Sequence, residues 1–351
     1  RRTGKHRESI DITTPLRSLK AATMAEVPVV MGMMNETSVM RRTGKEAIAD
    51  FLRRKTLYDA MRPSGKVVVF DTSIPIQLAF YALLEHDMPA APLWDSSSRR
   101  FVGLMSVTDF IDILRHYHRR GIPMDELSAR TIGEVMSDAD GRKMQQSLFL
   151  GTVAGTPIID GVQIMARNRQ RFLPLIPPDD ARVLSILSYR EVLRYLVDHF
   201  REQRRLFDDA VADLGIGQWG DKCLTVAGTA KLIDVLDLLE RSDISGVPVV
   251  DGNGRVVDVY SRSDITFLAA ATDAESVITN LDLTIQQVLS SEQRQAPAEK
   301  DKLHTVNPRA SLQAIFELFA DVGFQRVVAC DEAGRCLGVV TARDLIDYFC
   351  V

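Results

Sequence analysis

Apolar residues alternate along the chain between stretches with helical spacing and short continuous runs. The pattern is clearest between residues 228 and 271, where apolar side chains from Leu232 to Leu239 follow i, i+3, i+4, i+7 spacing. This spacing predicts an amphipathic helix. The following GVPVVD predicts a short buried strand, GNGR a turn and VVDVYS a second strand. Ser261 to Asp264 then opens another predicted helix, because Ser and Asp side chains cap free backbone N–H groups.

The same order of helix, strand, turn, strand and helix occurs four times. Near the C-terminus the two strands are RVVAC and CLGVVT, followed by residues 341–344. Near the N-terminus they are AAPLWD and FVGLMS, followed by 106–109, and a weaker copy has FLPLI and VLSILS, followed by 188–191. Each copy ends in a hydroxyl residue three positions before a carboxylate. The carboxylates, at 109, 191, 264 and 344, recur at intervals of 82, 73 and 80 residues.

A single repeat has too small a core to be stable alone, so the repeats should pair, and two pairs make one compact body with internal symmetry. The fold class is therefore α/β, of the mixed α+β kind. The predicted ranges are a basic N-terminal tail at 1–50 and four repeats at 51–118, 147–200, 222–272 and 302–351.

Composition and charge narrow the function classes. The hydrophobic content of 46%, the charged content of 26% and the net charge of −4 are ordinary for a globular protein and give no reason to expect general nucleic-acid binding. No apolar run reaches transmembrane length. The four cysteines form no C-x-x-C pair, which favours buried reduced thiols over a zinc site. The first 20 residues are basic and fit either a solvated tail or a docking segment for a partner.

The hydroxyl and carboxylate pair has two interpretations. One is helix capping, worth roughly 0.5–2 kcal/mol. The other is recognition of a vicinal diol such as ribose, as an acidic residue does in dinucleotide-binding folds. Catalysis finds no support, because the sequence contains no G-x-x-x-x-G-K-[ST], G-x-S-x-G or H-E-x-x-H motif. We therefore expect a protein that is not an enzyme.

The repeat resembles the CBS motif, which pairs into Bateman modules. The segments KVVVFDTSIPIQLAFYAL, AAPLWDSSSRRFVGLMSVTDFIDIL and GVPVVDGNGRVVDVYSRSDITFLAA resemble the gamma-subunit family of AMP-activated protein kinase, roughly over residues 53–348. The resemblance implies four CBS repeats paired into two Bateman modules that form a disc, with nucleotide sites at its centre.

The resemblance also implies roles for individual residues. Ribose contacts fall on Asp109, Asp264 and Asp344, accompanied by the hydroxyls of Ser106, Ser261 and Thr341. In the second repeat the family usually has Arg where this chain has Glu191, which either opens a further site or caps a helix.

The basic residues that bind phosphates in the family are only partly present. Pro89, Phe172 and Asp243 stand where the family has basic residues, and Gln325 replaces a His. Arg171, Arg190 and Arg326 remain as phosphate candidates, with surface salt bridges as the alternative role.

The function implied is a non-catalytic regulatory subunit that binds AMP, ADP or ATP between CBS repeats and regulates a kinase complex. Its partners would be a catalytic alpha subunit and a beta scaffold subunit, with the nucleotide as regulatory ligand and no other cofactor. Its location would be the cytoplasm, with the nucleus as a second compartment. Two alternatives remain: a CBS scaffold that has lost nucleotide binding, and a CBS protein that regulates an enzyme or channel other than a kinase.

Overall fold

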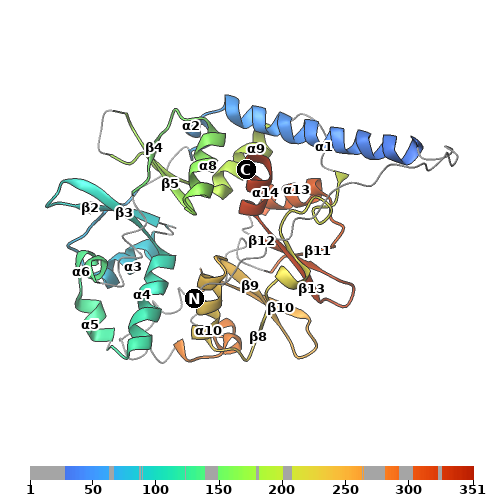
Figure 1. The fold of residues 1–351 in the computed structure, drawn as a ribbon. Helices are drawn as coiled ribbons and strands as arrows, with labels where there is room; N and C mark the ends of the chain where they lie inside the picture. Colours follow the sequence, from blue (N-terminus) through green and yellow to red (C-terminus); the bar gives the residue numbers. More distant parts are fainter. Residues whose placement is uncertain are drawn as a thin grey trace, which may run out of the picture. The chain divides into compact units, whose positions relative to one another are not determined.

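A computed structural model shows how the repeats are built (Figure 1). It describes residues 28–62, 67–86, 88, 90–122, 124–138, 149–178, 182–200, 208–262, 264, 281–291, 303–322 and 326–351. The chain divides into two compact units, residues 1–41 and 42–351, and the four repeats belong to the second unit.

Each repeat contains a three-stranded sheet of the same topology. A two-residue strand runs parallel to the central strand, which pairs antiparallel with the third strand. The strands are β1 (Phe70–Asp71), β2 (Ala90–Asp95) and β3 (Arg100–Ser106); β4 (Thr152–Val153), β5 (Phe172–Ile176) and β6 (Ser185–Ser188); β8 (Val226–Ala227), β9 (Gly246–Val250) and β10 (Val256–Ser261); and β11 (Thr305–Val306), β12 (Arg326–Cys330) and β13 (Cys336–Thr341). The long strands agree with the predicted ones, whereas the two-residue strands are too short to leave a sequence pattern.

The helices of the repeats are amphipathic, as their apolar spacing predicts. They are α3 (Ile76–Glu85) and α4 (Val107–Arg120); α8 (Ile158–Arg167) and α9 (Tyr189–His199); α10 (Leu232–Arg241); and α13 (Leu312–Val322) and α14 (Ala342–Cys350). In α10 the predicted apolar residues Leu232, Val235, Leu236 and Leu239 are all buried. The helix predicted after Asp264 falls outside the described residues.

Further elements connect or extend the repeats. They are α1 (Pro28–Arg54), α2 (Leu57–Ala60), α5 (Met124–Ala129), α6 (Ile132–Ser137), β7 (Gln218–Trp219), the 3₁₀ helix η2 (Gly220–Lys222) and α12 (Ile285–Leu289). Strand β7 adds to the fourth sheet beside β13. The α1 helix begins within the range assigned above to the N-terminal tail, and its Ile48 and Leu52 are fully buried. No helix in the described part of the chain is long and apolar enough to span a membrane.

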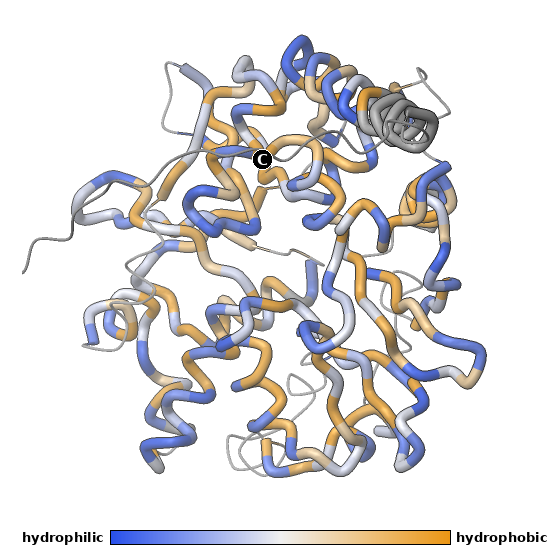
Figure 2. The backbone as a smooth tube through the Cα atoms, turned by 45° about the vertical axis from the view of Figure 1, so that its right-hand side comes forward, coloured by the Kyte–Doolittle hydropathy of each residue, from blue (hydrophilic) through white to orange (hydrophobic). Residues whose placement is uncertain are grey.

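Two hydrophobic cores hold the repeats together, and each is shared by repeats that are not consecutive in the sequence. The first core joins repeats one and three, where α4 packs on α10. The second joins repeats two and four, where α9 packs on α13 and α14. Hydrophobic stretches follow the strands, and the hairpin turns between them are hydrophilic (Figure 2). The mixed α+β fold is thus confirmed, and the apolar helix faces are buried between repeats.

Consecutive repeats three and four meet through their hairpins. Arg255 and Arg335 form an isolated antiparallel bridge, and the Val256 N–H donates to the Gly334 carbonyl at 2.9 Å. Repeats three and four therefore contact each other through the backbone, although each shares its core with a different repeat.

Candidate functional site

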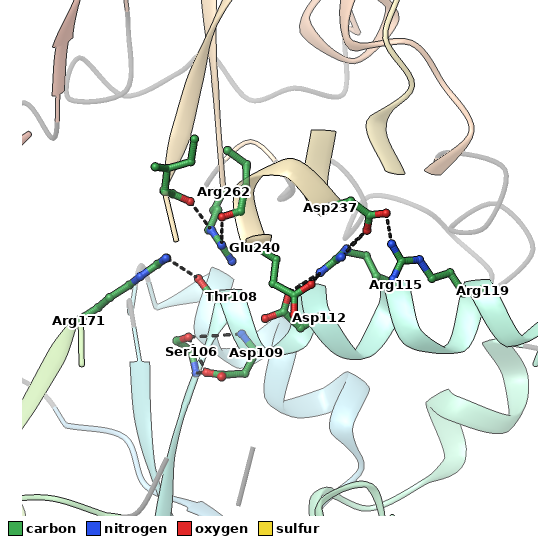
Figure 3. Close-up of polar contacts among 12 residues, drawn as sticks. Ser106, Thr108, Asp109, Asp112, Arg115, Arg119, Arg171, Asp237, Glu240 and Arg262 are labelled. Atoms are coloured by element: carbon green, nitrogen blue, oxygen red, sulfur yellow. Dashed lines mark hydrogen bonds and ion pairs between the residues drawn. The ribbon is translucent and has the colours of Figure 1, made fainter. Parts of the chain in front are cut away.

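The junction between β3 and α4 carries the first hydroxyl and carboxylate pair. The Ser106 N–H and hydroxyl both donate to Asp109 Oδ2, at 2.7 and 2.6 Å, and the Asp109 N–H donates to Ser106 Oγ at 3.4 Å (Figure 3). This is a capping box that satisfies free N–H groups at the start of α4. The hydrogen bonds that described residues give to Asp109 all go to Oδ2, which leaves Oδ1 for another donor.

The fourth repeat repeats this geometry. The Thr341 N–H and hydroxyl donate to Asp344 Oδ2 at 2.8 and 2.6 Å, and the Asp344 N–H donates to Thr341 Oγ1 at 3.2 Å. Within the described residues, Asp344 likewise receives hydrogen bonds through Oδ2. The start of α14 is therefore capped with one carboxylate oxygen to spare.

In the third repeat the pair is more deeply buried. Ser261 and Asp264 are 1% and 5% exposed, and the Ser261 N–H donates to Asp264 Oδ2 at 2.7 Å. The Ser261 hydroxyl donates to the same oxygen at 3.1 Å. A ligand would reach this carboxylate less easily than Asp109 or Asp344.

The second repeat differs because both oxygens of its carboxylate are engaged. Glu191 Oε2 accepts from the Ser188 N–H at 3.0 Å and also from the Ser188 hydroxyl. Glu191 Oε1 accepts from Arg62 Nε and Nη2, at 3.1 and 2.5 Å. Of the two roles left open for Glu191, this geometry favours helix capping.

A capping box alone does not identify a binding site in this chain. Thr131 with Glu134 and Thr284 with Gln287 form the same motif at α6 and α12, which are not strand-to-helix junctions of a repeat. The predicted capping role is confirmed at the described helices α4, α9 and α14, each of which begins with a capping box. Any recognition of a ligand must depend on burial, spare oxygens and nearby cations.

Burial changes the acidity of the junction carboxyls. Removal from water raises the pKa of Asp109, against the hydrogen bonds from Ser106 and the positive charges of Arg171 and Arg262. Burial likewise raises the pKa of Asp344, against the hydrogen bonds from Thr341. A hydroxyl-rich ligand would supply further hydrogen bonds to each ionised carboxylate and so offset the loss of water.

Arg171 reaches from the second repeat to the first. Its Nη1 donates to Thr108 Oγ1 at 3.4 Å, beside the Ser106 and Asp109 pair (Figure 3). Its Nη2 donates to Asp243 Oδ1 at 3.1 Å, in the third repeat. Arg171 thus lies where three repeats meet, with its side chain 25% exposed.

The other two predicted phosphate candidates have different surroundings. Arg326 is 5% exposed and its Nη2 donates to Ser245 Oγ at 3.1 Å. Gly246 makes room for it, because a Cβ there would lie 2.7 Å from the Arg326 guanidinium carbon. Arg190 is half-buried, and no hydrogen bond or ion pair joins it to another described residue. Pro89 and Gln325 lie outside the described residues.

Two arginines that the sequence analysis did not single out also lie here. Arg262 is 7% exposed and donates to the carbonyls of Leu239 and Ile244, at 3.0 and 3.1 Å. Burial lowers its pKa to about 10, with the charge of Arg171 acting in the same direction. Arg343 donates to Asp243 Oδ2 at 3.1 Å. The sequence could have indicated that these two arginines lie near the junctions, because both are part of the Ser/Thr-x-x-Asp tetrapeptides.

An ion-pair cluster around the buried Arg115 lies between α4 and α10. Arg115, 2% exposed, contacts Asp112 at 2.9 Å, Glu240 at 2.8 Å and Asp237 through Nε at 2.7 Å (Figure 3). The cluster joins repeats one and three, because Arg115 of α4 pairs with Asp237 and Glu240 of α10.

The cysteines and the metal-ligating side chains of the described residues form neither a disulfide nor a metal site. The four cysteines are free thiols, and the Sγ atoms of Cys223 and Cys336 lie 3.3 Å apart. Among the described residues, no group of three or more His, Cys, Asp or Glu side chains is arranged to hold a metal ion.

Comparison with known proteins gives the family context. The CBS domain family matches residues 153–198, 220–270 and 299–350. Human AMP-activated protein kinase subunit gamma-3 is 31% identical over 316 residues, which is 88% of this chain and 61% of that protein. The Bos taurus gamma-3 subunit is 30% identical, over 92% of this chain and 63% of that protein. The Dictyostelium discoideum gamma subunit is 29% identical, over 90% and 54%. The chain thus spans about three fifths of the mammalian relatives.

The fold is shared with a solved structure. A Methanocaldococcus jannaschii protein, titled a candidate archaeal homologue of the gamma subunit, has a TM-score of 0.65 at 16% identity, over 84% of this chain and 100% of that chain. At this identity the likeness concerns the fold.

Proposed function

Because the chain is a CBS-domain protein related over most of its length to the gamma subunits of AMP-activated protein kinase, we propose that it is a non-catalytic regulatory subunit that binds adenine nucleotides between its repeats. AMP, ADP or ATP would act as a regulatory ligand, with no resident cofactor. The partners would be a catalytic alpha subunit and a beta scaffold subunit, in the cytoplasm or the nucleus.

One observation carries the proposal. At the junction of the first repeat, the carboxylate of Asp109 lies beside Thr108, which accepts a hydrogen bond from Arg171 of the second repeat. A carboxylate with a spare oxygen suits the two hydroxyls of a ribose, and a guanidinium suits a phosphate. Ribose and phosphate are two of the three parts of a nucleotide.

Regulation would follow from the position of the ligand. Arg171 contacts residues of the first and third repeats, so a nucleotide that engages it changes the contacts between repeats. A ligand shifts a conformational equilibrium only by its difference in affinity for the two states. We propose that this difference is transmitted to a bound kinase.

The test is calorimetric titration of nucleotide-stripped protein with AMP, ADP and ATP. Asp109→Asn and Asp344→Asn remove one charge each but keep an oxygen that can cap the helix. We expect each to weaken binding at its own junction about tenfold, the effect of losing one charge-assisted hydrogen bond. Glu191→Gln is the matched control, because both oxygens of Glu191 are already engaged, and it should leave the affinity unchanged.

A scaffold without nucleotide binding is the second candidate function. It is favoured by the ion pairs that Arg171 and Arg343 make with Asp243, since these cations are already neutralised. A folded protein that binds none of the three nucleotides, yet assembles with kinase alpha and beta subunits in co-purification, would establish this second function instead.

A further inference from the structure

Asp243 lies between two arginines that come from different repeats. Its Oδ1 accepts from Arg171 Nη2 of the second repeat, and its Oδ2 accepts from Arg343 Nη1 of the fourth repeat, each at 3.1 Å. One carboxylate therefore bridges two guanidinium groups with one oxygen for each. Two oxygens of a phosphate would contact the same pair of arginines in the same way.

The position of Asp243 in its own repeat is unfavourable for an anion. It follows the C-terminal end of α10 and donates its N–H to the Glu240 carbonyl at 3.1 Å. The C-terminal end of a helix carries partial negative charge, so cations are preferred there. Its backbone also has a positive φ of 51°, which Asp tolerates better than most residues. The carboxylate is thus stabilised by its cations and not by its own helix.

The positive charges around Asp243 favour its ionised form. Burial opposes ionisation of Asp243, but the charge of Arg171 and the hydrogen bonds from Arg171 and Arg343 hold its pKa below the usual value. Arg262 adds a third positive charge near Arg171 and Asp243. Without Asp243, the arginines would leave a concentration of positive charge where the repeats meet.

The ion pairs remain accessible to solvent. The exposed side-chain fractions are 45% for Asp243, 25% for Arg171 and 32% for Arg343. A small anion in solution can therefore reach the guanidinium groups, and it competes with Asp243 for them. The pairs are partly screened by water, so exchange of one anion for another is feasible.

We propose that Asp243 is an internal counter-anion that occupies an anion subsite formed by Arg171 and Arg343, and that a phosphate-bearing ligand must displace it. This inference rests on the proposed function only in identifying the ligand as a nucleotide. It makes Asp243 a specificity-determining residue: it weakens binding of the phosphate groups and leaves recognition of the nucleoside to the junction carboxylates.

The probe for this subsite is inorganic pyrophosphate, titrated into the full chain by calorimetry. Asp243→Asn removes the charge, keeps the size and suits the positive φ. We expect pyrophosphate to bind Asp243→Asn about tenfold or more tightly than the wild type, which corresponds to ~1.4 kcal/mol. In the double variant Asp243→Asn/Arg171→Gln the gain in pyrophosphate affinity should disappear. This result would show that the gain depends on the arginine pair.

The matched control is Asp282→Asn. Asp282 follows the third repeat in the chain and pairs with Lys231 of that repeat at 3.1 Å in an exposed ion pair, so its loss changes the net charge equally. It should not alter pyrophosphate affinity. Asp243→Gly, which also accepts a positive φ, repeats the test so that a folding defect in one variant does not decide the result.

Two results would overturn the proposal: folded Asp243 variants that bind pyrophosphate no more tightly than the wild type, or a gain that persists in the double variant. AMP and adenosine separate this proposal from the proposed function. Tighter AMP binding by Asp243→Asn with unchanged adenosine binding supports both. A pyrophosphate gain in a protein that binds no adenine nucleotide supports the subsite and contradicts the nucleotide function.

Discussion

Arg62 and Glu191 are joined by two hydrogen bonds although 129 residues separate them in the chain. The Arg62 side chain is 57% exposed, whereas that of Glu191 is 10% exposed. Among the repeat junctions, Glu191 is the carboxylate whose two oxygens both accept hydrogen bonds from described residues, Oε1 from Arg62 and Oε2 from Ser188. The acid at 191 therefore has a structural partner where Asp109 and Asp344 each keep one oxygen for another donor.

Removing Arg62 should destabilise the protein because the nearly buried carboxylate of Glu191 would lose the cation that donates to it. We expect Arg62→Ala to lower the free energy of unfolding by about 1 kcal/mol, measured by urea denaturation. Arg194→Ala is the control, since Arg194 and Asp198 are 70% and 52% exposed. Equal effects of the two variants would show that the Arg62 pair is an ordinary surface ion pair.

Arg115 should be far more sensitive than its neighbour Arg119, although both contact Asp237. Arg115 is 3% exposed in its side chain and Arg119 is 47% exposed. Arg115→Ala leaves Asp112, Asp237 and Glu240 without their shared cation, so we expect a loss of roughly 3–5 kcal/mol. Arg119→Ala should cost about 1 kcal/mol or less. Chemical denaturation of both variants measures the difference, and a small loss for Arg115→Ala would mean that the acids are solvated.

Asp112 should make stability depend on pH. Burial raises its pKa from 3.8 to about 6, with the charge of Glu240 acting in the same direction. The folded state therefore binds this proton more tightly than the unfolded state, and the contribution of Asp112 to the free energy of unfolding falls as pH rises from about 3.8 to about 6. We expect Asp112→Asn to become more stable relative to the wild type over this interval, measured by urea denaturation at several pH values.

Asp251 provides the control of opposite sign. The backbone N–H groups of Arg255 and Asn253 donate to its carboxylate and lower its pKa. Its stabilising contribution is present above the unfolded-state pKa and is lost as pH falls. Asp251→Asn should therefore lose stability relative to the wild type as pH rises through the acidic range. The same trend in both variants would contradict the assignment for Asp112.

Gly246 should tolerate no side chain, because a Cβ would lie 2.7 Å from the Arg326 guanidinium carbon and 2.9 Å from the Tyr260 carbonyl oxygen. We expect Gly246→Ala to cost about 1–3 kcal/mol through overpacking and to displace Arg326. Gly252→Ala is the control, because no heavy atom of the described residues, apart from Gly252 and its two chain neighbours, lies within 4 Å of its Cβ position. Thermal unfolding of the two variants measures the difference in stability. A stable Gly246→Ala would show that Arg326 moves without loss.

The hairpin strands, the amphipathic helices and the capping boxes were predicted from sequence because they depend on residues close together in the chain. Ser106 and Asp109 are three residues apart, as are Thr341 and Asp344, so the spacing alone indicates their hydrogen bonds. The α1 helix was not predicted, because residues 1–50 were assigned to a basic tail, and the burial of its Ile48 and Leu52 depends on packing against distant parts of the chain. Arg343 was not predicted either, because its role depends on a residue 100 positions away.

By itself, then, the sequence determined the fourfold repeat, the order of elements within it and the hydroxyl and carboxylate pair at each junction. Only the tertiary structure decided that repeat one shares its core with repeat three and repeat two with repeat four, and that Asp243 bridges Arg171 and Arg343. The physical reason is that periodicity and capping are local properties of the backbone. The partner of an apolar face or of a charge is instead fixed by packing, which brings together residues far apart in the chain.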